Sequence, residues 1–445
     1  MSTPIRVVIA DDSPFMVRTL MQHLRSESGF EVVGTAVTGL RAVQLVEKLK
    51  PDVVTLDVEM PGWATEEAET ASETEGGLQA LRQIMSDVPT PVVMVSGVSR
   101  AAAAITMQAV EAGAVDFSLK YTPGVNTDPK TFRSEFLDKV RSAAQVRVVR
   151  SAATLEQATA DLDWDARMAA ARERMRSRDA AASQTIESKP TSDSTGIREG
   201  KITVGSGNSA IDQLYQRVNN RRSTVTQLAA TEKPPRSSRQ AGNTPESELL
   251  IIGASTGGPT ALRELLAELP HDFSLPIVIV QHMPAAFTGV LAAQLDRRLE
   301  LRVREAWDND PLLPGTVLIA PGGQHLKIQP DNTVSLFDAP KVLGHRPSID
   351  VTMKSAVQAI GGRVAGVILT GMGEDGATGL AEIHAAGGAT FAQQGDTCVV
   401  NGMPGKAIEL GAADNVGSPV EIGQQLAETW SGNIESPEAE TVPAI

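Results

Sequence analysis

Short apolar runs alternate with helical periods through the first part of the chain. The runs are rich in valine and isoleucine and nearly free of polar residues, which is typical of strands buried on both faces of a parallel sheet. We predict strands at Arg6–Ala10, Glu31–Val33, Val53–Leu56, Val92–Val95 and Val115–Phe117. Helical spacing predicts helices that start at Ser13-Pro14 and cover Gly39–Leu49, Leu78–Met85 and Ala101–Ala112. Repeated βα units of this kind predict a doubly wound α/β domain.

The same pattern resumes at Leu249. The runs LLIIGASTGG, LPIVIVQHMP, TVLIAPGG and VAGVILTGMG each read as a buried strand followed by a loop with glycine or proline. Helical periods follow at Pro259–Leu269, Ala285–Arg298, Ile349–Ile360 and Ala377–Ala386. This half of the chain is therefore expected to form a second α/β domain with a parallel sheet of its own.

The intervening stretch has few large apolar residues and is dominated by Ala, Ser, Thr, Arg and Glu. A segment of this composition cannot bury a core, so we interpret it as a long flexible linker with one weak helical patch at Leu162–Arg176. The predicted organisation is a first domain at 1–122, a linker at 123–247, a second domain at 248–431 and an acidic tail at 432–445.

Composition narrows the class of protein. The 445 residues carry a net charge of −14, which argues against nucleic acid as a partner because phosphate backbones require a basic surface. The single cysteine, Cys398, cannot form an internal disulfide, as is usual in a reducing cytosol. No uncharged apolar run approaches the roughly 20 residues that span a bilayer, and the start MSTPIRVVIADD is not a signal peptide. We expect a soluble cytoplasmic protein without membrane insertion.

Acidic residues follow two of the predicted strands in the first half. Asp11 and Asp12 come directly after the first strand, and Asp57 follows the third. The carboxyl ends of parallel strands meet at one sheet edge, so the three carboxylates are expected to converge there. Carboxylates that converge in this way suit Mg²⁺, which favours oxygen ligands. Ser96 and Lys120, at the ends of the fourth and fifth strands, would supply a hydroxyl and an ammonium for a phosphoryl group.

Each of these residues taken alone has a simpler explanation, since Asp12 or Ser13 can cap the first helix. Together, the segments VVIADDSPFMVRTL, PDVVTLDVEMPG, VVMVSGVS and AVDFSLK resemble the receiver domain of bacterial response regulators. The resemblance implies that Asp57 is phosphorylated and that Mg²⁺ is bound by Asp11, Asp12, Asp57 and the backbone carbonyl of Glu59. It also implies that Ser96 and Lys120 sense the phosphoryl group and that Phe117 is the switch aromatic residue.

One segment departs from the receiver pattern. Receivers usually have a short turn after the Met-Pro pair, whereas this chain inserts GWATEEAETASETEGG at Gly62–Gly77. Its five glutamates in a background of small and polar residues predict a solvated loop rather than an added core element.

In the second half, a serine lies in a glycine-rich turn between a strand and a helix. Ser255 in GASTGG is expected where backbone N–H groups at a helix N-terminus can bind an oxyanion. The G-x-S-x-G pattern alone equally fits a structural turn or a nucleotide loop. However, the segment lacks both the G-x-G-x-x-G spacing and the lysine of a P-loop, which disfavours a nucleotide.

A serine nucleophile needs a base and an orienting acid. Of the six histidines, His282 follows a buried strand, PIVIVQH, and therefore shares the sheet edge with Ser255, while His325 and His345 remain alternatives in irregular segments. Asp375 in ILTGMGEDG follows another strand and would accept the imidazole N–H. Glu374 is less suitable because adjacent side chains diverge, and Cys398 lies in a valine-rich run typical of a small buried hydrophobe.

The order Ser, His, Asp along the chain differs from that of the α/β-hydrolases. The segments GASTGGP, QHMP, RPSID, LTGMGEDG and TCVVNGMPGKAIELGA resemble the catalytic domain of the protein-glutamate methylesterases of bacterial chemotaxis. The resemblance implies that Ser255 is the nucleophile, His282 the general base and acid, and Asp375 the orienting acid. It places the oxyanion site at the backbone N–H of Thr256 and at Met372.

The two resemblances together imply a phosphorylation-activated methylesterase of chemotaxis adaptation. Its substrates would be glutamate methyl esters on methyl-accepting chemoreceptors, its second activity the deamidation of receptor glutamines, and its phosphodonor the chemotaxis histidine kinase. A receiver joined to a pure binding module would not need the serine, histidine and aspartate. A transcription factor is disfavoured because no basic helix-turn-helix is evident. A methylesterase of a non-flagellar pathway has the same sequence features.

Overall fold

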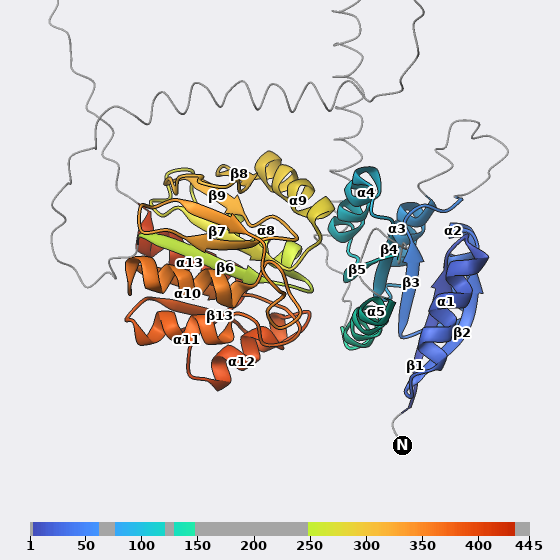
Figure 1. The fold of residues 1–445 in the computed structure, drawn as a ribbon. Helices are drawn as coiled ribbons and strands as arrows, with labels where there is room; N and C mark the ends of the chain where they lie inside the picture. Colours follow the sequence, from blue (N-terminus) through green and yellow to red (C-terminus); the bar gives the residue numbers. More distant parts are fainter. Residues whose placement is uncertain (1–2, 62–75, 121–128, 147–247, 432–445) are drawn as a thin grey trace, which may run out of the picture. The chain divides into compact units, whose positions relative to one another are not determined.

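The computed structural model describes residues 3–61, 76–120, 129–146 and 248–431 (Figure 1). The predicted helical patch at Leu162–Arg176, the acidic tail and most of the Gly62–Gly77 insertion lie outside the described residues. Among the helices that are described, none combines the length and the apolar character needed to cross a membrane.

The first domain contains a five-stranded parallel sheet in the order β2-β1-β3-β4-β5. The predicted strands are confirmed with small shifts of their ends, and the second is longer than expected. The strands are β1 (Ile5–Ala10), β2 (Phe30–Ala36), β3 (Val53–Asp57), β4 (Val92–Ser96) and β5 (Asp116–Leu119).

Helices cover both faces of this sheet because alternate strand residues point to opposite sides. Val7 and Ile9 pack with helices α1 and α5, whereas Val8 and Ala10 pack with α2, α3 and α4. The helices are α1 (Pro14–Arg25), α2 (Gly39–Leu49), α3 (Gly76–Asp87), α4 (Arg100–Glu111) and α5 (Pro129–Ala143).

Helix α5 lies inside the segment that the sequence predicts to be a flexible linker. Phe136 and Val140 of this helix are fully buried and pack with Val7 and Ile9 of β1. The helix was missed because its exposed face is strongly charged and its apolar residues are few. The prediction that the region from residue 123 buries no core is therefore wrong for 129–143.

The second domain contains a seven-stranded parallel sheet in the order β14-β13-β12-β6-β7-β9-β8, and an antiparallel hairpin, β10-β11. The prediction of two parallel-sheet α/β domains is therefore confirmed. The sheet strands are β6 (Leu249–Ala254), β7 (Ile277–Gln281), β8 (Arg302–Glu305), β9 (Thr316–Ile319), β12 (Val364–Ile368), β13 (Thr390–Gln393) and β14 (Asn415–Gly417), and the hairpin consists of β10 (His325–Ile328) and β11 (Val334–Phe337).

The helices of the second domain also lie on both faces of its sheet (Figure 1). Leu250 and Ile252 of β6 pack with α8, α9 and α13, whereas Leu249 and Ile251 pack with α10, α11 and the hairpin. The helices are α8 (Gly258–Ala267), α9 (Ala285–Arg298), α10 (Ile349–Ile360), α11 (Ala377–Ala385), α12 (Met403–Glu409) and α13 (Pro419–Trp430).

Both sheets reverse their strand order at one point, which is where open α/β sheets bind ligands. In the first sheet the chain leaves β1 toward β2 and returns on the other side at β3, so the reversal lies between β1 and β3. In the second sheet it lies between β6 and β12. Asp11 directly follows β1 and Asp57 ends β3, whereas Ser255 directly follows β6 and Asp375 lies in the loop after β12.

Candidate active site

Ser255 follows β6 in a tight turn that leads into α8. Its backbone N–H donates to the carbonyl of Thr370 at 3.0 Å, which joins the turn to the loop after β12. Gly257 caps α8 with φ of 78°, and a Cβ there would lie 2.6 Å from the Cβ of Val399, so the turn requires glycine. A Cβ on Gly371 would approach the Cβ of Ser255 to 2.7 Å. The serine is therefore held closely between two loops.

His282 follows β7 and lies beside the serine turn. The register pairs Ala254 with Gln281, so Ser255 and His282 are the next residues on neighbouring parallel strands. The side-chain amide of Gln281 donates to the carbonyls of Ser255 at 2.9 Å and of His282 at 3.3 Å. Gln281 therefore ties together the backbones that carry the two functional side chains.

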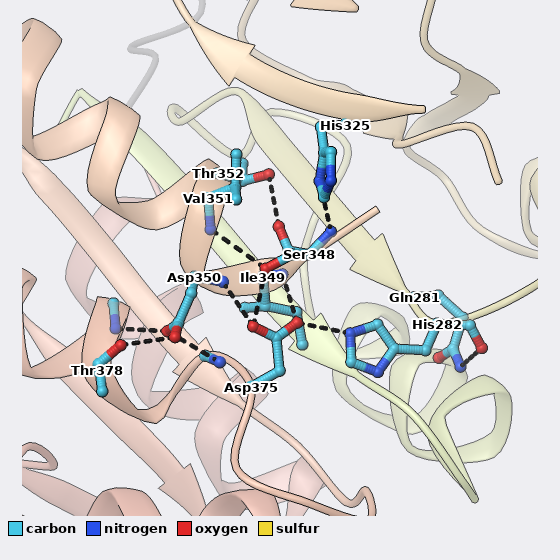
Figure 2. Close-up of polar contacts among 12 residues, drawn as sticks. Gln281, His282, His325, Ser348, Ile349, Asp350, Val351, Thr352, Asp375 and Thr378 are labelled. Carbon is cyan, nitrogen blue, oxygen red and sulfur yellow. Dashed lines mark hydrogen bonds and ion pairs between the residues drawn. The ribbon is translucent and has the colours of Figure 1, made fainter. Parts of the chain in front are cut away.

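Asp375 lies in the loop between β12 and α11 and is almost completely buried, with a side chain 1% exposed. Its Oδ2 lies 2.8 Å from Nε2 of His282 and accepts the backbone N–H of Ile349, also at 2.8 Å. Its Oδ1 accepts the backbone N–H of Asp350 at 3.1 Å and the hydroxyl of Ser348 at 2.9 Å. Figure 2 shows the carboxylate between the imidazole and the first residues of α10.

These contacts determine the protonation of Asp375. Burial alone would raise the pKa of this carboxyl, but the hydrogen bond and charge of His282 and the N–H groups of Ile349 and Asp350 outweigh it. The net result is a lowered pKa. A carboxylate at a helix N-terminus is favoured in addition by the helix dipole. Asp375 is thus held as an anion next to the imidazole.

Asp350 makes the matching contacts in the opposite direction. Its carboxylate accepts the backbone N–H groups of Gly376 at 3.0 Å and Gly379 at 2.7 Å, and the hydroxyl of Thr378 at 2.6 Å. These donors belong to the start of α11. Each of the two helices therefore uses its first turn to bind an aspartate from the other segment, which fixes the loop that carries Asp375.

The imidazole of His282 has one nitrogen engaged and one available. Nε2 faces Asp375, whereas Nδ1 is buried and has no hydrogen-bond partner among the described residues. The ring of His345 stacks on that of His282 with centroids 3.7 Å apart and planes within 5° of parallel. The stacked ring keeps the imidazole of His282 in one plane.

The other residues that the sequence offers as base, acid or nucleophile have surroundings that differ from those of His282, Asp375 and Ser255. Burial, followed by the charge of His282, lowers the pKa of His345 to about 4, which makes it a weak base. His325 is 1% exposed, and its nitrogens contact the backbone of Pro340 and Ser348. Glu374 is exposed. Burial, with Asp396 nearby, raises the pKa of the half-buried Cys398 to about 12, far from that of a reactive thiol.

The residues expected at the oxyanion site lie in the two loops around Ser255. Thr256 follows the serine, and Met372 follows Gly371, whose Cα faces Ser255. The backbone N–H groups of Thr256 and Met372 donate no hydrogen bond to any part of the chain that the structure describes. An open pocket of about 560 Å³ adjoins Asp375 and His345, with Asn401, Lys406 and Glu409 on its wall.

The acidic residues of the first domain also converge. One carboxylate oxygen from each of Asp11, Asp12 and Asp57 lies within 4.8 Å of the others. Asp11 and Asp57 are buried, whereas Asp12 and Glu59 are exposed. The backbone N–H of Glu59 donates to Asp57 at 3.2 Å. This geometry fits a divalent cation that takes oxygen ligands and keeps water on its open side.

Lys120 reaches this cluster from the end of β5. Its Nζ lies 2.6 Å from Oδ2 of Asp57 and 3.1 Å from Oδ2 of Asp11, so one ammonium bridges the two buried carboxylates. Burial raises the pKa of Asp57 to about 7; the charge of Lys120 opposes this rise, and that of Asp11 adds to it. One lysine does not fully compensate the buried acids, as expected of a site that also takes a cation.

The remaining switch candidates lie close by in the sheet. Ser96 ends β4, and its hydroxyl lies 2.7 Å from that of Thr106 on α4. The backbone N–H of Lys120 donates to the carbonyl of Ser96 at 2.7 Å. Phe117 lies on β5, with Nζ of Lys139 5.1 Å from its ring centroid. The sequence does not point to Thr106, because nothing in it indicates which side chain a helical threonine will contact.

Sequence reasoning also missed Gln281, Ser348 and Asp350 in the second domain. Ser348 and Asp350 belong to the segment RPSID, and a serine before a helical period predicts an N-cap. That signal identifies the cap of α10 but not the aspartate that the same hydroxyl contacts. Only the fold brings the loop after β12 to this helix.

Comparisons with known proteins identify the family of each domain. The model of the CheB methylesterase family matches residues 250–426, and that of the response regulator receiver domain matches residues 7–124. The protein-glutamate methylesterase/protein-glutamine glutaminase of Symbiobacterium thermophilum is 37% identical over 413 residues, 93% of each chain. A second, from Anaeromyxobacter dehalogenans, is 36% identical over 416 residues, again 93% of each chain.

Among solved structures, the CheB methylesterase catalytic domain of Thermotoga maritima is 42% identical and matches with a TM-score of 0.40. The match covers 41% of this chain and 98% of that chain. The sequence relatives are similar over nearly their whole length and this chain's. The chain therefore belongs to the family of protein-glutamate methylesterases/protein-glutamine glutaminases, with a receiver domain ahead of the CheB methylesterase domain.

Proposed function

We propose that this protein hydrolyses glutamate methyl esters of chemoreceptors and that phosphorylation of its receiver domain activates it. The observation that carries the proposal is the 2.8 Å contact between buried Asp375 and His282, which lies beside Ser255 at the end of the neighbouring strand. A binding module has no need of an anionic carboxylate held against an imidazole whose other nitrogen is free. The family supports the same substrate class.

In the proposed reaction, Ser255 is the nucleophile. His282 takes the hydroxyl proton, with its unpaired Nδ1 as the base, and the serine oxygen attacks the ester carbonyl. Methanol leaves with the proton from the imidazolium, and water then hydrolyses the acyl-enzyme by the reverse sequence. Asp375 holds the tautomer and stabilises the imidazolium. The side-chain amide of glutamine would react in the same way and release ammonia, which gives the deamidase activity.

The tetrahedral intermediate needs donors for its oxyanion. We assign this role to the backbone N–H of Thr256, at the start of α8, and to Met372 in the loop after β12. Their unengaged N–H groups support the assignment, since donors aimed at developing charge act without reorganisation.

In the receiver domain, Asp57 is the proposed phosphorylation site, with a histidine kinase as phosphodonor. Asp11, Asp12, Asp57 and the carbonyl of Glu59 would hold Mg²⁺, which neutralises phosphoryl oxygens during transfer. Lys120 would then pair with the phosphoryl group, and Ser96 would leave Thr106 to donate to it. Phe117 would follow this shift as the switch aromatic residue.

The domain boundaries and the location of the substrates belong to the same proposal. The first domain would occupy residues 1–122 together with α5. The second domain would occupy residues 248–431. The remainder of 123–247 would serve as the linker, followed by a tail at 432–445. The substrates are expected on the cytoplasmic side of the membrane, where the kinase phosphorylates its regulators. The identity of the receptors depends on contacts outside the catalytic residues.

Replacement of the nucleophile is the direct test of the chemistry. The variant Ser255→Ala should lose esterase activity by about 10⁶-fold, because it removes the proposed nucleophile. Methanol release from methyl-labelled receptor membranes measures this loss, and Ser335→Ala on β11 serves as the control. Substantial turnover by purified Ser255→Ala would contradict the assignment.

A second variant tests the placement of Ser255 without removing it. In Gly371→Ala the new Cβ would press on the Cβ of Ser255 and on the side chain of Met403. Displacing a nucleophile by a fraction of an ångström to an ångström costs up to about 100-fold in rate, so we expect a loss in kcat of about 10- to 100-fold. Gly289→Ala, whose Cβ has room at 3.5 Å from Glu305, is the matched control. Equal kcat in both variants would argue against close packing at the serine.

Regulation is tested on the full chain. A small-molecule phosphodonor with Mg²⁺ should raise the rate of methanol release several-fold to about 100-fold, the range of a coupling of about 1–3 kcal/mol. Asp57→Asn should abolish the increase. Asp52→Asn should preserve it, because Asp52 is exposed and binds the backbone N–H of Arg6 at the start of the neighbouring strand. A response that survives in Asp57→Asn would contradict phosphorylation at this residue.

A further inference from the structure

We propose that Ser348 is a positioning residue for the esterase reaction: its hydroxyl holds the carboxylate of Asp375 in the orientation that His282 requires. The proposal rests on the function proposed above and deepens it. Ser348 lies outside the three residues assigned to the reaction, at the N-cap of α10. It is completely buried, and its hydroxyl contacts the carboxylate oxygen of Asp375 that does not face the imidazole (Figure 2).

The hydroxyl of Ser348 is shared between two tasks. It donates to Oδ1 of Asp375 at 2.9 Å, and it accepts the backbone N–H of Val351 at 3.4 Å as the helix cap. The donated bond is the shorter and ends on a charged group, which makes it the stronger of the two. An N-cap serine normally serves its own helix alone, whereas here its proton goes to the aspartate of another loop.

The backbone of Ser348 is fixed independently of this hydroxyl. Its N–H donates to Nδ1 of the buried His325 at 3.3 Å, and Nε2 of His325 contacts the carbonyl of Pro340 at 3.1 Å. Its carbonyl accepts from the backbone of Thr352. Because these hydrogen bonds hold the backbone of Ser348 in place, its hydroxyl donates from a fixed position.

The four contacts of Asp375 differ in what they control. The N–H groups of Ile349 and Asp350 belong to the backbone at the start of α10. Oδ2 binds the N–H of Ile349 and Nε2 of His282, and Oδ1 binds the N–H of Asp350. The Ser348 hydroxyl is the remaining donor and the only side-chain donor to this carboxylate besides His282 in the described part of the chain. Without it, one lone pair of a buried anion stays unpaired, and Oδ1 is held by the N–H of Asp350 alone, so the carboxylate can rotate more easily.

Rotation of the carboxylate would weaken the bond to Nε2 of His282, and with it the alignment of Nδ1 toward Ser255. Such a loss affects proton transfer in the transition state and leaves the binding of the receptor unchanged. It should therefore appear in kcat and not in KM. A purely structural cap predicts a different result, namely lower stability with unchanged kinetics of the folded enzyme.

The test compares three variants at Ser348 in the full-length protein. Ser348→Ala and Ser348→Gly both remove the hydroxyl, but glycine is a far better N-cap than alanine, so the two differ in stability. If the hydroxyl positions Asp375, both should lose about 10- to 100-fold in kcat at unchanged KM, the range of one hydrogen bond to a charged group. Ser348→Thr keeps the hydroxyl and should restore kcat to within a few-fold of the original enzyme.

Ser418→Ala supplies the matched control. Ser418 caps α13 in the same domain, with a capping box to Glu421, and has no contact with the catalytic residues. Its loss should lower the midpoint of urea unfolding, as the loss of a helix cap does, while kcat stays unchanged. The kinetic parameters are measured on methyl-labelled receptor membranes, with folding checked by circular dichroism.

Three outcomes would overturn the proposal. The first is a kcat of Ser348→Gly within twofold of the original enzyme. The second is a rise in KM without loss of kcat, and the third is failure of Ser348→Thr to restore activity in a folded protein. The proposed function is judged separately by Ser255→Ala, which must be inactive whatever happens at Ser348.

Discussion

The exchange of hydrogen bonds between the starts of α10 and α11 is the constraint on which the esterase site depends. The first turn of α10 binds Asp375, which precedes α11, and the first turn of α11 binds Asp350, which belongs to α10. Helix N-termini carry unsatisfied N–H groups and a partial positive charge, so each aspartate is stabilised as an anion. The two loops thereby fix each other, and Asp375 is held against His282 at the cost of burying two carboxylates.

The sheet supplies the other half of the arrangement. Parallel strands end at the same edge, and open α/β sheets bind ligands where the strand order reverses, which here is between β6 and β12. Ser255 and His282 are neighbours because the register aligns the ends of β6 and β7, and Gln281 joins their backbones. The receiver sheet uses the same geometry between β1 and β3 for Asp11 and Asp57. One architecture thus serves two chemistries, which differ in the side chains at the strand ends.

The sequence predicted where the strands end, because hydrophobic runs locate strand ends, and parallel strands share an edge. Ser255, His282, Asp375 and Asp57 were all identified in this way. Contacts between segments far apart in the chain left no such signal. Ser348 indicates only a helix cap, the ring of His345 that stacks on His282 comes from an irregular segment, and α5 has too few apolar residues to be recognised. These features depend on which loops the fold brings together.

The central claim is that Asp375 and His282 activate Ser255. It is tested most directly by labelling the protein with a fluorophosphonate, which reacts with activated serine hydroxyls, and mapping the modified peptide. The account predicts a single adduct on Ser255, formed rapidly in the original protein and slowed by several orders of magnitude in His282→Ala. An adduct on another residue, or labelling of Ser255 at the same rate without His282, would contradict it.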